Sequence, residues 1–171
     1  GAFSLVMGRH SSNPDTSQMP FSYLIEKNGV TYLAPAVNLR SVGTIRDVQK
    51  WPKRDKRHPE GRLDQVNFNL LSPYTVSKMV NALQILRQLQ EFSGATSDTY
   101  SYQSARITNS SLHRGIDLYT KAINKFLGNS LISRLEQIDA DLTRLAPSTE
   151  EGLGEWVDLS GQIVPHAMLS E

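Results

Sequence analysis

The chain has 171 residues, of which 39% are hydrophobic and 20% charged, so it can bury a core of its own and is not expected to be disordered. It has no cysteine and no apolar run of about 18 residues, which excludes disulfides, thiolate chemistry and a membrane-spanning helix. We therefore expect a cytoplasmic protein, because proteins of a reducing compartment do without disulfides.

The net charge is only +1, but the charges are unevenly distributed along the chain. The segment 40–62 carries eight Lys and Arg residues against three acidic ones, whereas the segment 136–171 carries one against eight. Such blocks can attract each other within one fold or recognise separate partners. The basic block is short and poor in aromatic residues, so we expect no nucleic-acid partner.

The N-terminal third is predicted to form strands and loops. An apolar run at 2–7 indicates a short strand that Gly8 ends, and the turn-rich segment 11–20 indicates a surface loop. The clearest local signal follows, where the β-prone runs 21–26 and 30–34 are joined by Lys27-Asn28-Gly29. Because Asn and Gly readily take the positive φ angles of a tight turn, these runs predict a β-hairpin.

The next segment is less regular. Val42, Ile45 and Val48 recur at helical spacing, which predicts a short helix over 42–51 that Pro52 stops. Residues 53–61 form a charged loop with Pro and Gly, and residues 63–71 are consistent with an extended segment that leads to the next helix.

The second half is predicted to be helical. Ser72-Pro73 is typical of a helix start, and Ser93-Gly94 of its end. The connection 95–109 is polar, with room for a strand around 100–102. Further helices are expected from Ser111 to Gly128 and from Asn129 to Pro147, either separate or joined as one kinked helix. Each of these helices has an apolar stripe that needs cover. The first stripe consists of Val76, Met79, Val80, Leu83, Leu86 and Leu89, and the second of Leu112, Ile116, Tyr119, Ile123 and Phe126.

These elements predict an α+β fold that is mostly α: an N-terminal hairpin and strands, followed by a small antiparallel bundle of three to four helices. We divide the chain into three regions. Residues 1–62 hold the hairpin and the basic loop, and residues 63–147 hold the bundle. The acidic tail 148–171 either packs on the bundle or leads into a further segment.

Three stretches carry a resemblance to a known family: Met7–His10 through Pro20–Ile25, the block Arg54-Asp55-Lys56-Arg57, and Asn69–Val76. On these residues the chain resembles a family of long bacterial proteins whose front portion is similar to the left-handed parallel β-helix of hexapeptide-repeat acyltransferases and sugar nucleotidyltransferases. The resemblance implies that this chain is an internal or C-terminal fragment of such a protein. It also implies that residues 1–62 continue the β-helix.

The candidate binding residues are basic. Arg forks and Lys ammonium groups clustered in one segment suit phosphate groups, on a sugar nucleotide or on coenzyme A. The candidates for such contacts are Arg40, Arg46, Lys50, Lys53, Arg54, Lys56 and Arg57. The alternative is a solvated loop that pairs with the acidic tail.

His10 is the one candidate for a catalytic base, because it lies in a polar loop beside Arg9; a loop histidine bonded to nearby backbone is the alternative. The other three histidines are scattered, so no metal site and no cofactor are expected. No phosphate-binding glycine loop or nucleophile motif is present.

Two functions follow from this sequence. The first is an accessory helical domain that caps or oligomerises a β-helix protein and has no chemistry of its own. Its partners would be the rest of the parent chain or further copies of it. The second is part of a nucleotidyltransferase or acyltransferase site, with the basic segment on a phosphorylated ligand. We expect the first, and the sequence does not decide whether the parent is an enzyme.

Overall fold

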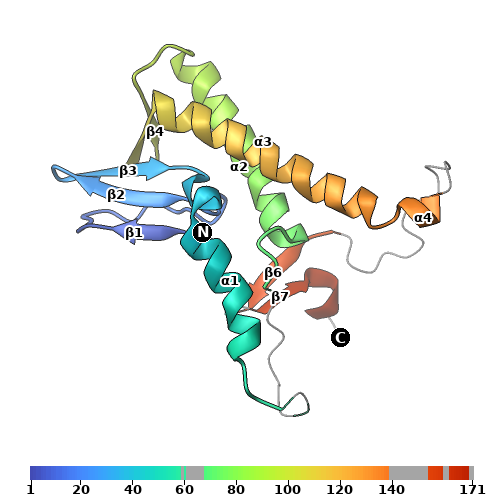
Figure 1. Ribbon diagram of the computed structural model, residues 1–171. Coiled ribbons are helices and arrows are strands. Elements are labelled where there is room, and N and C mark those ends of the chain that lie inside the picture. Colours follow the sequence, from blue (N-terminus) through green and yellow to red (C-terminus); the bar gives the residue numbers. More distant parts are fainter. Residues whose placement is uncertain (59, 61–67, 139–153, 160–161, 170–171) are drawn as a thin grey trace.

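The computed structural model describes residues 1–58, 60, 68–138, 154–159 and 162–169. Its centre is a five-stranded mixed sheet with two long helices against it, so the fold is α+β (Figure 1). The strand order is β1-β2-β3-β5-β4, and these strands are β1 (Leu5–Met7), β2 (Tyr23–Lys27), β3 (Val30–Ala34), β4 (Thr99–Tyr102) and β5 (Ala105–Thr108). Both domain boundaries expected from the sequence, at 62–63 and at 147–148, lie outside the described residues.

The predicted hairpin is confirmed. β2 and β3 pair antiparallel, and Lys27 opposite Val30 leaves Asn28 and Gly29 as the two-residue turn. Both turn residues have positive φ, 53° and 76°, which is the conformation that this turn needs. The strand expected near 2–7 is β1, which runs parallel to β2 at the edge of the sheet.

The two long helices are α2 (Pro73–Ser93) and α3 (Asn109–Ile132). The helix start at Ser72 is confirmed, because Ser72 Oγ accepts from the Thr75 N–H at 3.3 Å while Thr75 Oγ1 accepts from the Ser72 N–H at 2.9 Å. Gly94, with φ 85°, ends α2 as expected. α3 starts at Asn109, two residues before the expected start at Ser111, because Thr108 is its N-cap.

The expected bundle of three to four helices does not form among the described residues. Gly128 does not end α3, because it keeps a helical φ and the helix runs on to Ile132, so no separate helix starts at Asn129. The short α4 (Leu135–Ile138) follows α3, and the expected end at Pro147 lies outside the described residues. α2 and α3 pack against each other and against the sheet, which buries or half-buries most residues of their apolar stripes.

One face of the sheet carries the core. Strand residues that lie opposite each other share a face, and the buried ones all belong to one face that α2 and α3 cover. These residues are Leu24, Thr31, Leu33, Tyr100, Ala105 and Ile107. The other face, with Tyr23, Ile25, Tyr32 and Arg106, is only half-buried or exposed. We call it the outer face.

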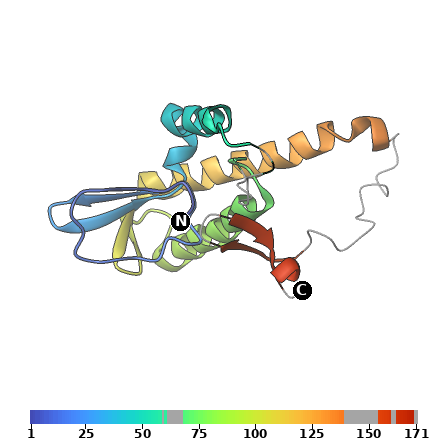
Figure 2. The same cartoon turned by 90° about the horizontal axis from the view of Figure 1, so that it is seen from below.

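The remaining elements lie at the margins of this core. The 3₁₀ helix η1 (Val37–Arg40) leads into α1 (Val42–Arg54), which has no buried residue and continues two residues past Pro52, where we expected it to stop. In Figure 2, α1 and α2 lie on opposite sides of α3. The tail contains the antiparallel pair β6 (Trp156–Leu159) and β7 (Gln162–Pro165), then η4 (His166–Leu169), and β6 contacts α2.

Candidate functional site

Most of the predicted phosphate-binding residues lie on or just after α1. Arg46, Lys50 and Arg54 are four residues apart, so they share one side of the helix, and Lys53 lies next to them; all four are exposed. The Arg46 Nε lies 3.2 Å from an Asp47 carboxylate oxygen. Lys56 is exposed as well, and Arg57 Nη2 donates to Asp55 at 2.9 Å. Arg46, Lys50, Lys53 and Arg54 form a basic strip along α1, and Lys56 and Arg57 follow the end of the helix.

Arg40 is separated from this strip. It lies at the end of η1 and lines a hollow of about 280 Å³ together with Arg114 of α3, Tyr23 of β2, Val37 and Ser41. The structure thus brings together two arginines that are far apart in the sequence. Arg114 was not predicted, because it stands alone in an amphipathic helix and no local pattern marks it.

Asn38 holds the wall of this hollow in place. Its side chain is buried, and its Oδ1 accepts from the Tyr23 hydroxyl at 3.2 Å and from Thr44 Oγ1 at 2.9 Å. Its Nδ2 donates to the Phe3 carbonyl at 2.5 Å. Strand β2, η1, the first turn of α1 and the N-terminal segment are therefore joined at one side chain, which fixes the backbone that carries Arg40.

His10 takes part in the structure of its loop. Its Nδ1 lies 2.9 Å from Thr31 Oγ1, and its Nε2 lies 3.0 Å from the Met7 carbonyl oxygen. A carbonyl can only accept, so Nε2 carries the proton in the neutral ring and Nδ1 accepts from the threonine hydroxyl. Both ring nitrogens therefore have hydrogen-bond partners within the chain, Nε2 with the backbone of Met7 and Nδ1 with the Thr31 side chain of β3.

Asp15, in the same loop, also has a structural role. It accepts from the backbone N–H of Ser17 at 2.7 Å and from Ser17 Oγ at 3.0 Å, and these two bonds lower the pKa of the Asp15 carboxyl. In the part of the chain that the structure describes, no three His, Cys, Asp or Glu side chains are grouped so that they could hold a metal ion.

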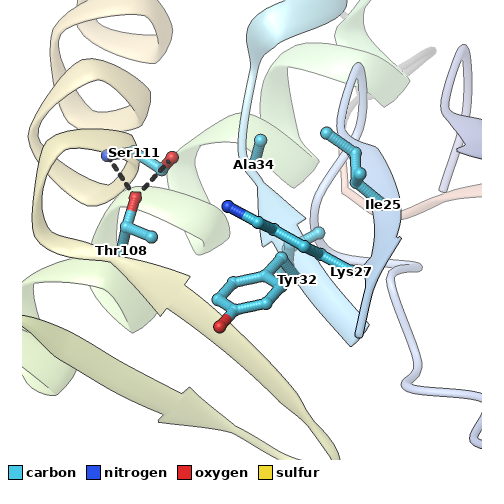
Figure 3. A pocket seen from close by; sticks show the side chains of 7 residues that line it. Ile25, Lys27, Tyr32, Ala34, Thr108 and Ser111 are labelled. Carbon is cyan, nitrogen blue, oxygen red and sulfur yellow. Dashed lines mark hydrogen bonds between the residues drawn. The ribbon is translucent and has the colours of Figure 1, made fainter. Parts of the chain in front are cut away.

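A second hollow, of about 300 Å³, lies on the outer face of the sheet (Figure 3). Its floor is apolar, with Ile25 and Tyr32 beside the start of α3. The two hydroxyls at its rim serve that helix, because Thr108 Oγ1 accepts from the Ser111 N–H at 3.2 Å and donates to Ser111 Oγ at 2.9 Å. Lys27 reaches over the hollow from β2 (Figure 3).

Residues 1–90 match the domain of unknown function DUF4954. The chain belongs to this family. The DUF4954 match covers β1, β2, β3, η1, α1 and most of α2. It therefore includes Tyr23, Arg40 and Ser41 of the first hollow, whereas Arg114 lies beyond it. No curated protein and no solved structure matches the chain. The name of the family states no activity, so the function must be argued from the geometry.

Among the described helices, none is both long enough and apolar enough to cross a membrane.

Proposed function

We propose that this chain is an accessory domain that docks through the free edge of its sheet onto the β-helix of a larger protein, with no chemistry of its own. The observation that carries the proposal is the exposure of β1. All three of its side chains are apolar, and Leu5, Val6 and Met7 are 43%, 60% and 37% exposed. An apolar strand at an open sheet edge is a template for pairing with another strand.

The hydrogen bonding of β1 supports this proposal. The Leu5 N–H donates to the Ser22 carbonyl at 2.9 Å, so Leu5 faces β2 and the backbone groups of Val6 point to the open edge. The Val6 N–H and C=O have no hydrogen-bond partner in the part of the chain that the structure describes. One further strand would satisfy them and cover Val6.

The direction of β1 indicates what kind of strand fits. Because β1 is parallel to β2, one more parallel strand would continue the same ladder, and the coils of a parallel β-helix stack their strands in this way. Two copies of β1 related by a two-fold axis would instead pair antiparallel. A β-helix coil of the parent protein is therefore favoured over a symmetric dimer, which is the other expected partner.

Hydrogen–deuterium exchange of the isolated chain and of the full-length parent protein tests the proposal. We expect the Val6 amide to exchange slowly only in the parent, because the new strand would accept its hydrogen bond. Val6→Lys should abolish this protection there, whereas Val42→Lys, on the exposed α1, should not. In the isolated chain each variant should change the free energy of unfolding by about 0.5 kcal/mol or less.

Equal exchange of the β1 amides in the chain and in the parent would contradict the proposal. Protection that depends on the concentration of the isolated chain, together with a dimer in sedimentation, would show pairing between copies and also contradict it.

A further inference from the structure

We infer that the hollow between Arg40 and Arg114 binds the phosphate group of a small phosphorylated compound. This inference goes beyond the docking of β1 and does not depend on it. The hollow lies between η1, β2 and α3, and Arg40 and Arg114 are both among the residues that line it. Two planar forks on one small concave surface are suited to the several oxygens of a phosphate.

The two arginines carry uncompensated charge. Within the described part of the chain, neither Arg40 nor Arg114 has an ion pair or a side-chain hydrogen bond. By contrast, Arg46, Arg57 and Lys121 each form an ion pair with a nearby aspartate. Two like charges that face one hollow repel each other, and an anion placed between them would relieve that repulsion while it accepts from both groups.

The backbone that carries these arginines is held in place. η1 is fixed by the Asn38 hydrogen bonds and by Leu39 N–H to Ala36 O at 3.0 Å. Next to Arg114, Gly115 packs so closely that an added Cβ would lie 2.8 Å from Pro35 Cβ. Both arginines therefore extend from backbone anchored to the core, which reduces the ordering cost of binding.

The adjoining hollow indicates where the organic part of the ligand lies. Tyr23 and Ile25 are two residues apart on β2 and face the same side, about 7 Å from each other along the strand. Ser111 and Arg114 are one turn apart on α3 and line the second and the first hollow. An apolar group attached to a phosphate between the arginines would therefore extend toward Ile25 and Tyr32 of the second hollow. Figure 3 shows these two side chains.

The test is a titration of the ¹⁵N-labelled chain, followed by NMR, with inorganic phosphate and with phenyl phosphate at constant ionic strength. We expect saturable shifts of the Arg40 and Arg114 Nε–H signals and of the Ser41 amide. Phenyl phosphate should bind more tightly than inorganic phosphate, because its ring reaches the apolar hollow. Constant ionic strength matters because general screening also moves the signals of exposed charges.

The variants Arg40→Gln and Arg114→Gln should each weaken phenyl phosphate binding about 10- to 100-fold, the range for loss of a charged hydrogen bond. Arg87→Gln on α2 makes the same charge change outside the walls of both hollows and should leave the affinity unchanged. Val6→Lys, at the proposed docking edge, should also leave it unchanged. Both arginines are exposed, so the variants should fold, and an unchanged amide spectrum away from the hollow verifies this.

Any one of three results would overturn the inference. The first is a set of chemical shifts that does not saturate. The second is that Arg40→Gln and Arg114→Gln bind phenyl phosphate like the unsubstituted chain, and the third is that Arg87→Gln weakens the binding equally. Equal affinity for inorganic phosphate and phenyl phosphate would overturn the placement of the organic part on β2.

Discussion

At the scale of single residues, Tyr119 shows how this small core accommodates polar groups. Its side chain is fully buried, and its hydroxyl donates to the Pro20 carbonyl at 2.6 Å and lies 3.4 Å from Ser22 Oγ. Burial raises the pKa of the Tyr119 hydroxyl far above its usual value, so the hydroxyl keeps its proton and can donate at neutral pH. Tyr119 thus joins α3 to the segment before β2.

We predict that Tyr119→Phe lowers the free energy of unfolding by about 1–3 kcal/mol, because the buried Pro20 carbonyl loses its donor. Urea unfolding measures the change, and the slope of the unfolding free energy against urea concentration should be the same in the variant and the unsubstituted chain. Tyr32→Phe is the matched control, since no partner for its hydroxyl is found among the described residues, and it should cost about 0.5 kcal/mol or less. Equal effects at the two positions would contradict the importance of this hydrogen bond.

At the scale of elements, two glycines of α3 show how packing overrides helix propensity. Gly115 is buried against Pro35 and Leu86, and a Cβ there would lie 2.8 Å from Pro35 Cβ and 3.3 Å from Leu86 Cδ1. Gly128 has no such neighbour, since a Cβ there meets no described atom within 4 Å. The same residue type therefore permits a close contact at one position and only weakens the helix at the other.

We predict opposite signs for alanine at these positions. Gly115→Ala should destabilise the protein by about 1–3 kcal/mol, because the rigid Pro35 ring must move to admit the methyl group. Gly128→Ala should stabilise it by about 0.5–1 kcal/mol through helix propensity. Thermal unfolding of both variants measures the difference, and a stabilised Gly115→Ala would show that the contact yields easily.

At the scale of the whole molecule, α2 and α3 cover one face of the sheet, whereas the described residues cover the outer face, the β1 edge and α1 only in part. α1 is the extreme case, with Val42 78% and Trp51 61% exposed on a helix that buries no residue. Its apolar side chains therefore contribute little to the stability of the isolated chain. The hydrophobic core depends on α2, α3 and the inner face of the sheet.

We predict that α1 opens without unfolding the rest of the chain. In native-state hydrogen exchange, its amides should have opening free energies of about 3 kcal/mol or less, whereas the core amides of α2 should approach the global value of about 5–15 kcal/mol. Low concentrations of denaturant should not change the opening free energies of the α1 amides, because local opening exposes little surface. Equal protection of α1 and α2 would show that α1 belongs to the core.

The elements that the sequence predicted correctly have local causes. Asn28-Gly29 turns the hairpin because these two residues accept positive φ, and Ser72-Pro73 starts α2 because the serine caps its first turn. The apolar stripes of α2 and α3 identified Met79, Leu86 and Tyr119 as core residues, although Val80 of the same pattern is 41% exposed. Each of these signals lies within a few residues of the structure that it predicts.

Only the tertiary structure decided how these elements combine. β5 was not predicted, since its pairing with β3 depends on a segment far away in the chain, and the helices packed on the sheet because its inner face offered apolar cover. The hollow at Arg40 arises in the same way. The sequence alone determined that Arg40 belongs to a basic segment, but Arg114 reaches it only because the core holds α3 against η1, and no local pattern encodes contact over that separation.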